Sequence, residues 1–92
     1  KEPTYYSDSS EVKLSQFASG SIVRGKVENS VISRNVDLSE GSSVSHSILF
    51  PRVKLQGATV EYAIVDKGVE IAEGVTIRGT ENNPVVIKKV AL

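Results

Sequence analysis

Apolar residues recur every five or six positions along most of this 92-residue chain. The series runs without a gap and comprises Val12, Phe17, Ile22, Val27, Ile32, Leu38, Val44, Leu49, Leu55, Val60, Val65, Ile71 and Ile77. Two positions before each member of the series except the first there is a small or slim side chain. These residues are Ser15, Gly20, Gly25, Ser30, Val36, Ser42, Ser47, Val53, Ala58, Ala63, Val69 and Val75. This spacing fits neither a 3.6-residue helix nor the two-residue alternation of a simple strand. It fits a short strand followed by a corner, with one inward side chain per strand.

Three such steps make one turn of a triangular prism, so the inward residues are expected to stack in three columns. The first column would contain Val12, Val27, Val44, Val60 and Ile77, the second Phe17, Ile32, Leu49 and Val65, and the third Ile22, Leu38, Leu55 and Ile71. The residue two positions earlier has to be small because the chain turns inward there. A bulky side chain at that point would collide with its counterpart one coil away.

The repeat is also visible as longer phrases. Residues 27–36 read Val-Glu-Asn-Ser-Val-Ile-Ser-Arg-Asn-Val, and they align without gaps with residues 44–53 and 60–69. Internal repeats of this kind indicate a solenoid in which each unit buries its apolar side against the next. We therefore predict an all-β fold, a single-stranded parallel β-helix of hexapeptide repeats with about four coils.

The β-helix is predicted over residues 12–79. Residues 1–11 lie outside the repeats and are interpreted as a lead-in or linker, and residues 80–92 as a capping strand and tail, because the open end of a solenoid needs a cover. The chain begins at Lys1 and contains no methionine, so we expect it to be part of a longer protein.

Composition argues against several classes of function. Eleven basic and eleven acidic residues balance, so no global field attracts nucleic acid or an anionic membrane. There is no apolar run approaching the length of a membrane span and no signal-peptide pattern. The absence of cysteine excludes disulfides and is compatible with a cytoplasmic location. With one histidine, no cysteine and no glycine-rich phosphate loop, we predict no metal site and no cofactor.

His46 is the one residue that suggests catalysis. It follows Val44 by two positions, so it should point outward in the same column as Asn29 and Tyr62. A histidine here could act as the general base of a hexapeptide-repeat acyltransferase, but a base needs oriented partners and a substrate pocket. The even spacing of the repeats also leaves no insertion loop to hold acetyl-CoA. We therefore interpret His46 as a solvent-facing residue.

Basic residues offer a candidate binding surface. Arg34, Arg52 and Lys67 follow the second column by two or three positions and should stack along one corner, with Arg24 at the next corner. The functional interpretation is a site for a phosphate-bearing effector or an acidic partner, because the arginine fork matches phosphate oxygens. The alternative is an ordinary solvated face.

Several stretches resemble the C-terminal left-handed β-helix of bacterial glucose-1-phosphate adenylyltransferases, also called ADP-glucose pyrophosphorylases. They are residues 27–36, the segment Val-Lys-Leu-Gln-Gly-Ala at 53–58 and the segment Ile-Val-Asp-Lys-Gly-Val-Glu-Ile at 64–71. The lead-in Pro-Thr-Tyr-Tyr at 3–6, with Val-Lys-Leu-Ser at 12–15, is most similar to the regulatory-type GlgD subunits. The resemblance also supplies the left hand of the coil, since parallel crossovers are otherwise right-handed.

The resemblance implies a non-catalytic domain of an enzyme that makes ADP-glucose from glucose 1-phosphate and ATP for glycogen synthesis. Nucleotidyl transfer in that family occurs in an N-terminal domain, and the β-helix serves subunit association and allosteric regulation. The implied partner is a catalytic subunit of the same enzyme in a homo- or hetero-oligomer, and the basic residues described above add a phosphorylated effector as a candidate ligand. Two alternatives remain, a hexapeptide-repeat acyltransferase and a bare scaffold without a metabolic role.

Overall fold

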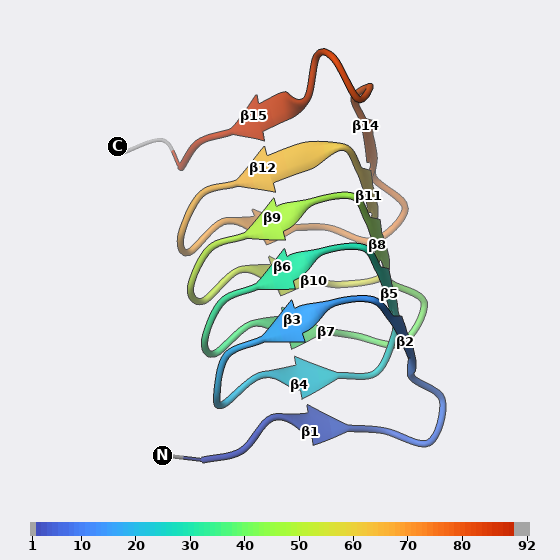
Figure 1. The fold of residues 1–92 in the computed structure, drawn as a ribbon, viewed down its shortest axis with the longest axis vertical. Helices are drawn as coiled ribbons and strands as arrows, with labels where there is room; N and C mark the ends of the chain where they lie inside the picture. The colour runs from blue at the N-terminus through green and yellow to red at the C-terminus, as the bar shows by residue number, and fades with distance from the viewer. Residues whose placement is uncertain (1, 90–92) are drawn as a thin grey trace.

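The computed structural model describes residues 2–89, which form fifteen short β-strands and no helix (Figure 1). The strands are β1 (Tyr5–Tyr6), β2 (Glu11–Lys13), β3 (Gln16–Phe17), β4 (Ile22–Val23), β5 (Lys26–Glu28), β6 (Val31–Ile32), β7 (Asp37–Leu38), β8 (Ser43–Ser45), β9 (Ile48–Leu49), β10 (Lys54–Leu55), β11 (Thr59–Glu61), β12 (Ala63–Val65), β13 (Glu70–Ile71), β14 (Thr76–Arg78) and β15 (Val85–Ile87). Within the described part of the chain there is accordingly no helix long and apolar enough to cross a membrane.

The strands form three parallel sheets, each of five strands. Sheet A has the order β1-β4-β7-β10-β13, sheet B the order β2-β5-β8-β11-β14, and sheet C the order β3-β6-β9-β12-β15. Because each strand pairs with the strand three places later, the chain winds as a continuous coil with one sheet on each side. Figure 1 shows a left-handed coil that rises from the N-terminus at the bottom to the C-terminus at the top. The predicted left-handed parallel β-helix is confirmed.

Two of the three predicted columns have the expected register. In sheet B, Val12, Val27, Val44, Val60 and Ile77 are direct neighbours on successive strands. In sheet C, the same holds for Phe17, Ile32, Leu49 and Val65, and Ile87 continues the column beyond the predicted repeats. Both columns are confirmed.

The third column differs from the prediction in its first member. Leu38, Leu55 and Ile71 stack as expected in sheet A, but the neighbour of Leu38 on β4 is Val23. Val23 is fully buried, whereas Ile22 is only half-buried and pairs with Asp37 on the outer side of the sheet. The assignment of Ile22 to the column was therefore wrong. The small residue two positions earlier is correspondingly Ser21 and not Gly20.

The corner before sheet A explains this shift. Each chain segment that leaves sheet C makes the same turn, with a positive φ three residues before the inward side chain of sheet A. The residues in this conformation are Gly20, Asn35, Arg52 and Gly68. Counting three residues forward from Gly20 gives Val23 as the inward side chain of β4. The interval that is shorter than five residues is the one from Val23 to Val27, at the next corner. There the connection through Gly25 runs so close to the following coil that an added β-carbon would lie 2.3 Å from the Ser42 carbonyl oxygen.

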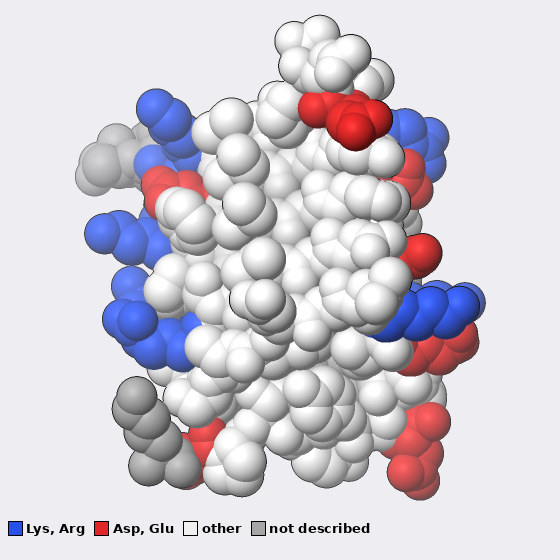
Figure 2. Space-filling model, viewed as in Figure 1, with Lys and Arg blue, Asp and Glu red and all other residues white. Residues whose placement is uncertain are grey.

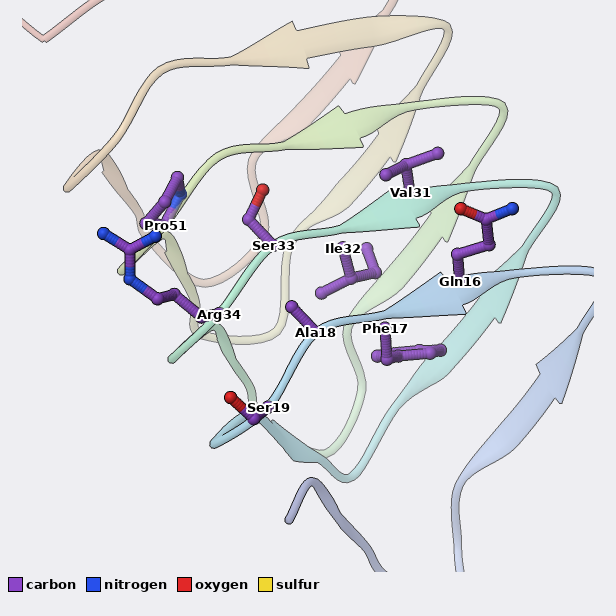
Figure 3. A pocket seen from close by; sticks show the side chains of 9 residues that line it. All are labelled: Gln16, Phe17, Ala18, Ser19, Val31, Ile32, Ser33, Arg34 and Pro51. Carbon is purple, nitrogen blue, oxygen red and sulfur yellow. The ribbon is translucent and has the colours of Figure 1, made fainter. Parts of the chain in front are cut away.

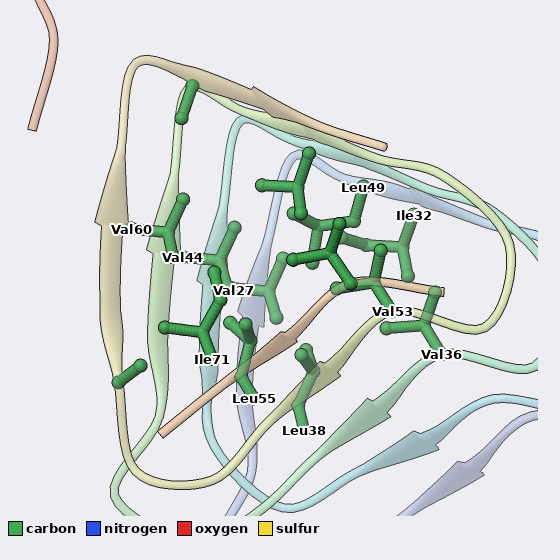
Figure 4. Close-up of a cluster of buried hydrophobic side chains, with 14 of the residues drawn as sticks. Val27, Ile32, Val36, Leu38, Val44, Leu49, Val53, Leu55, Val60 and Ile71 are labelled. Carbon is green, nitrogen blue, oxygen red and sulfur yellow. The ribbon is translucent and has the colours of Figure 1, made fainter. Parts of the chain in front are cut away.

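The three columns fill a dry core (Figure 4). Ile32, Leu38, Leu49, Leu55 and Val65 each expose no more than 1% of their surface. Burial of each such side chain contributes at most about 1.5–3 kcal/mol, because unfolded chains already bury part of their apolar surface. The core is less complete at the N-terminal end, where Val12 is 37% exposed.

Buried serines connect successive coils. The Ser47 hydroxyl donates to the Ser45 carbonyl at 2.8 Å and accepts the Ala63 N–H at 3.1 Å. The Ser30 hydroxyl accepts the Ser47 N–H in the same way, at 3.1 Å. Each serine thus satisfies a backbone donor that the strand ladder leaves unpaired at the corner. Ser21 and Ser42 make equivalent pairs of bonds at the other two corners.

Both ends of the repeat region gain a further strand. In the lead-in, β1 pairs with β4, and the Tyr6 ring meets Phe17 edge-on with centroids 5.4 Å apart. In the predicted capping segment, β15 pairs with β12. Residues 90–92 of that segment lie outside the described residues.

Candidate functional site

Three of the four basic residues predicted to form a binding surface lie at the corner between sheets C and A. The Arg52 N–H donates to the Arg34 carbonyl at 3.1 Å, so these residues lie on adjacent coils, and Lys67 occupies the same turn one coil further. All three side chains are exposed, and none forms an ion pair within residues 2–89. Figure 2 shows Lys and Arg side chains along this edge, on the left.

Lys89 extends this group, although the sequence patterns did not indicate it. Its ammonium nitrogen lies 3.0 Å from the point where Gly68 would carry a β-carbon, so its side chain lies over the turn that holds Lys67. The Asp66 carboxylate accepts the Lys67 N–H at 2.8 Å and supplies one negative charge beside these cations. We call Arg34, Arg52, Lys67 and Lys89 the basic corner.

Arg24 is separated from the basic corner. It follows β4 at the corner between sheets A and B, where its N–H donates to the Leu38 carbonyl at 2.9 Å and its carbonyl accepts the Ser9 hydroxyl at 3.2 Å. Of the four predicted surface residues, the structure thus brings three together and leaves Arg24 on another edge.

A shallow cavity of about 450 Å³ lies beside the basic corner. Its lining includes Phe17, Ala18 and Val31, and Arg34 and Pro51 stand on one side of it (Figure 3). The small side chains of Ala18 and Ser33 leave this space open on the outer side of sheet C. The hollow therefore offers an uncharged surface next to a guanidinium group.

His46 points outward, as predicted, in a column with Asn29 and Tyr62. All three residues have φ near +50°, at 49°, 48° and 51° for Asn29, His46 and Tyr62. The imidazole stacks on the Tyr62 ring with centroids 4.5 Å apart and an interplanar angle of 7°. The Asn29 side-chain nitrogen lies 3.5 Å from His46 Nε2, at the limit of a hydrogen bond. Stacking of this kind fixes the ring on the surface.

Paired charges characterise the outer side of sheet B. Arg78 forms a fork with Glu61, with Nε–Oε1 and Nη2–Oε2 distances of 2.9 and 3.4 Å. This hydrogen bond and the charge of Glu61 raise the pKa of the Arg78 guanidinium above its usual value. Lys26 and Glu11 lie 3.8 Å apart on the same side. No group of three or more His, Cys, Asp or Glu side chains suited to a metal ion occurs among the residues that the structure describes.

The outer side of sheet C is different, because an apolar column runs along it. Val31, Ile48, Ile64 and Val86 are neighbours on successive strands, and Phe50 lies beside them. We call these five residues the apolar face. The same outer positions of sheet A hold Asp37, Lys54 and Glu70 on β7, β10 and β13. Figure 2 looks onto the apolar face and shows charged side chains mainly at its edges.

Sequence reasoning missed the apolar face, although a signal was present. Each of Val31, Ile48 and Ile64 immediately precedes an inward residue of the second column. Two adjacent apolar residues on a strand point to opposite sides of a sheet, so one of them must face outward. The repeat spacing accounts only for the inward member of each pair.

Comparison with known proteins identifies relatives of the chain. A protein family described as GlmU-like, C-terminal hexapeptide matches residues 5–84. The chain is 33% identical over 86 residues to a glucose-1-phosphate adenylyltransferase of Bacillus cytotoxicus, with 92% of this chain and 23% of that protein covered. For the enzyme of the same name from Corynebacterium jeikeium, identity is 42% over 62 residues, covering 65% of this chain and 15% of that protein.

A third relative, the glucose-1-phosphate adenylyltransferase of Bacillus thuringiensis strain Al Hakam, is 32% identical over 81 residues, covering 87% of this chain and 22% of that protein. The chain therefore spans less than a quarter of the length of each of these three relatives.

Proposed function

We propose that this chain, which belongs to the family of GlmU-like C-terminal hexapeptide domains, is the C-terminal β-helix domain of a glucose-1-phosphate adenylyltransferase. The similarity to the Bacillus cytotoxicus enzyme over 92% of the chain carries this proposal. In this function the domain associates subunits and transmits regulation, while nucleotidyl transfer takes place in another part of the protein. A regular β-helix with a dry core suits this task, because it is a rigid body with three long surfaces.

The proposed partner is a catalytic subunit of the same enzyme, and the proposed location is the cytoplasm, where ADP-glucose is made. The Pro-Thr-Tyr-Tyr lead-in at 3–6 supports a regulatory subunit of the GlgD type. In the structure this lead-in contributes β1, whose exposed tyrosines lie at the N-terminal end of the solenoid. A subunit of this type would modulate a catalytic partner and have little activity of its own.

The basic corner is the proposed site for a phosphorylated effector. Arg34, Arg52 and Lys67 are unpaired within residues 2–89, so their donors are free for phosphate oxygens. The adjacent hollow over Ala18 would take the uncharged part of such a ligand. Arg24, on a separate edge, would contribute to a partner contact only.

The test uses the complete protein that contains this sequence, produced alone and together with a catalytic subunit. We expect it to change the rate or the effector response of ADP-glucose formation from glucose 1-phosphate and ATP. A matched protein without residues 1–92 should fail to assemble with the catalytic subunit. If the complete protein neither makes ADP-glucose nor alters the activity of a catalytic subunit, the proposal is wrong.

The arrangement around His46 supports an acyltransferase as a second candidate. His46 lies with Asn29, Tyr62 and Glu81 beside a shallow cavity of about 380 Å³. Against this function, the ring is stacked on Tyr62, and none of the connections between strands in the repeat region forms an inserted loop within the described residues. Acyl transfer from acyl-CoA by this chain, abolished by His46→Ala, would favour the acyltransferase.

A further inference from the structure

The three corners of the solenoid, which are the chain segments between the strands of neighbouring sheets, differ in charge. Among residues 2–89, the corner between sheets C and A carries five lysine and arginine side chains and two carboxylates. The corner between sheets B and C carries one carboxylate, that of Glu81. The corner between sheets A and B carries one cation and three carboxylates, namely Arg24, Asp8, Glu40 and Glu73. Positive charge is therefore concentrated on one edge of a chain whose overall charge is balanced.

The cations of this edge form a single row with one step per coil. The turns of Arg34, Arg52 and Lys67 lie on successive coils and are joined by N–H to carbonyl bonds of 3.1 and 3.0 Å. Lys88 and Lys89 follow on the next coil, directly after β15. Figure 2 shows the row along the left edge of the molecule. Because neighbouring strands are about 4.8 Å apart, positive charge repeats at roughly this interval along the solenoid axis.

The two carboxylates of this edge do not neutralise the row. Glu2 precedes β1 and therefore lies two coils before Arg34, which precedes β7. The two oxygens of the Asp66 carboxylate accept backbone N–H groups, from Lys67 at 2.8 Å and from Lys89 at 3.5 Å. Within the described residues, neither carboxylate forms an ion pair with a side chain of the basic corner. The ammonium and guanidinium groups of the row thus keep their donors for a ligand.

The surfaces on either side of the row limit the width of a ligand. On one side lies the outer face of sheet C, where the apolar face offers no charge. On the other side, the first residues of β7, β10 and β13 are Asp37, Lys54 and Glu70, two carboxylates and one ammonium group. An anion wider than the row would meet these carboxylates, so the edge favours a narrow ligand that extends along the axis.

We propose that the basic corner binds inorganic polyphosphate, a linear chain of phosphate groups, aligned with the solenoid axis. A single phosphate contacts the cations of one coil or of two adjacent coils, whereas a chain of phosphates contacts all four coils at once. Arg34 and Arg52 supply planar forks that match phosphate oxygens, and Lys67 and Lys89 supply point charges. The inference deepens the effector site of the proposed function by naming the class of phosphorylated ligand, and its regulatory consequence rests on that function.

Nucleic acid fits this row less well than polyphosphate does. A duplex presents two phosphate strands that border a major groove about 12 Å wide, and the described residues provide no second row of cations parallel to the first. Single strands are held by stacking successive bases on aromatic side chains. Within residues 2–89, Phe50 is the one exposed aromatic residue next to the basic corner. A polyanion without bases needs neither feature.

Isothermal titration calorimetry of the chain with long-chain polyphosphate, tripolyphosphate and orthophosphate tests the dependence on ligand length. We expect a Kd of about 10–100 μM for the long chain at low salt, and binding at least about 10-fold weaker for orthophosphate. The logarithm of the binding constant should fall with the logarithm of salt concentration with a slope of about −2 to −3, because three or four phosphates are neutralised. Orthophosphate that binds as tightly as the long chain would overturn the proposal.

Variants that remove charge locate the site. Arg34→Gln combined with Arg52→Gln preserves side-chain length and should weaken polyphosphate binding by about 10-fold or more, with a salt slope shallower by about 1.4. The matched control is Arg24→Gln combined with Lys13→Gln, which removes the same charge from another corner and from sheet B. It should change the affinity less than about 2-fold. Equal losses in the two double variants would show that net charge alone attracts the ligand and would overturn the proposal.

Circular dichroism monitors the fold of each variant, and Lys67→Gln replaces Arg52→Gln if the latter unfolds, because Arg52 has a φ of 65°. A thymidine oligonucleotide that binds as tightly as polyphosphate of equal charge would overturn the choice of ligand. All these measurements use the chain alone. Failure to bind polyphosphate therefore leaves the effect of the complete protein on ADP-glucose formation untouched, and the two failures can be told apart.

Discussion

The two sides of sheet C are both apolar, but they contribute differently to the molecule. On the inner side, Ile32 and Leu49 are at most 1% exposed and pack against the other two columns. On the outer side, their neighbours Val31 and Ile48 remain 44% and 37% exposed. The inner column is required for the fold. The outer column is an addition to it, since the corresponding outer positions of β7, β10 and β13 in sheet A and of β2 and β5 in sheet B carry charged side chains.

This contrast shows that the β-helix separates folding from function. The inward residue of each strand and the small residue before it determine the coil, and the outward residues are free to vary. Sheet C uses this freedom for an apolar surface, the neighbouring corner for cations, and sheet B for ion pairs such as Arg78–Glu61. Substitutions on the inner side should therefore lower stability, and those on the outer side should affect interactions.

Truncation on the inner side of sheet C should have the largest effect. Ile32→Ala or Leu49→Ala opens a cavity in a narrow core and should lower the free energy of unfolding by about 2–5 kcal/mol. The outer substitution Ile48→Ala should lower it by less than about 1 kcal/mol in the monomer. Urea denaturation at a protein concentration that keeps the chain monomeric provides the measurement. Equal losses for Leu49→Ala and Ile48→Ala would contradict the distinction between the two sides.

Two neighbouring residues on β4 sharpen the same distinction in sheet A. Val23 is fully buried and Ile22 half-buried, so Val23→Ala should cost about 1.5–3 kcal/mol and Ile22→Ala less than about 1 kcal/mol. This order is the opposite of what side-chain size alone would give, because isoleucine loses more carbon atoms than valine on mutation to alanine. A larger loss for Ile22→Ala in thermal or urea unfolding would restore the register expected from the spacing.

Removing a buried serine hydroxyl should have an intermediate effect. Ser47→Ala leaves the Ala63 N–H without its partner in a buried corner, at a cost of about 1–3 kcal/mol. Ser45→Ala, on the outer side of the preceding strand, is the control and should change stability by less than about 0.5 kcal/mol. Indistinguishable unfolding midpoints for the two variants would show that the serine is retained only for its size.

The outer polar positions should have the smallest effects on stability. Ser33→Ala and the double substitution Arg34→Ala with Arg52→Ala should each change the free energy of unfolding by less than about 0.5 kcal/mol, because these side chains are partly or fully exposed. Under the proposed function, the arginine double variant should nevertheless weaken the response of the complete protein to a phosphorylated effector. Activation curves recorded with sugar phosphates measure this, and unchanged curves would exclude these two arginines from an effector site.

Most of the fold could be predicted from the sequence because one inward residue per strand leaves a regular pattern. Two complete columns were correct for this reason. The third failed at Ile22 because two adjacent apolar residues, Ile22 and Val23, both fit a spacing of five or six. The turn with positive φ at Gly20, Asn35, Arg52 and Gly68 decides which of the two residues faces inward. The sequence does not reveal this turn, because Gly, Asn and Arg form no recognisable pattern at these positions.

The candidate surfaces were less predictable. Arg34, Arg52 and Lys67 could be placed at one corner because they follow a correctly assigned column. Lys89 could not, because the tail lies outside the repeats and its register depends on the pairing of β15 with β12. The hydrogen bonds of the buried serines were also not foreseen, since the pattern shows only that a small side chain is needed.

The register of the interior columns is tested most directly by NMR distance measurements between methyl groups of neighbouring coils. Adjacent strands are about 4.8 Å apart, so stacked inward side chains give strong cross-peaks. We expect cross-peaks from Val23 to Leu38 and from Leu38 to Leu55, with none of comparable strength from Ile22 to Leu38. A strong contact between Ile22 and Leu38, with Val23 pointing to solvent, would contradict the structure described above.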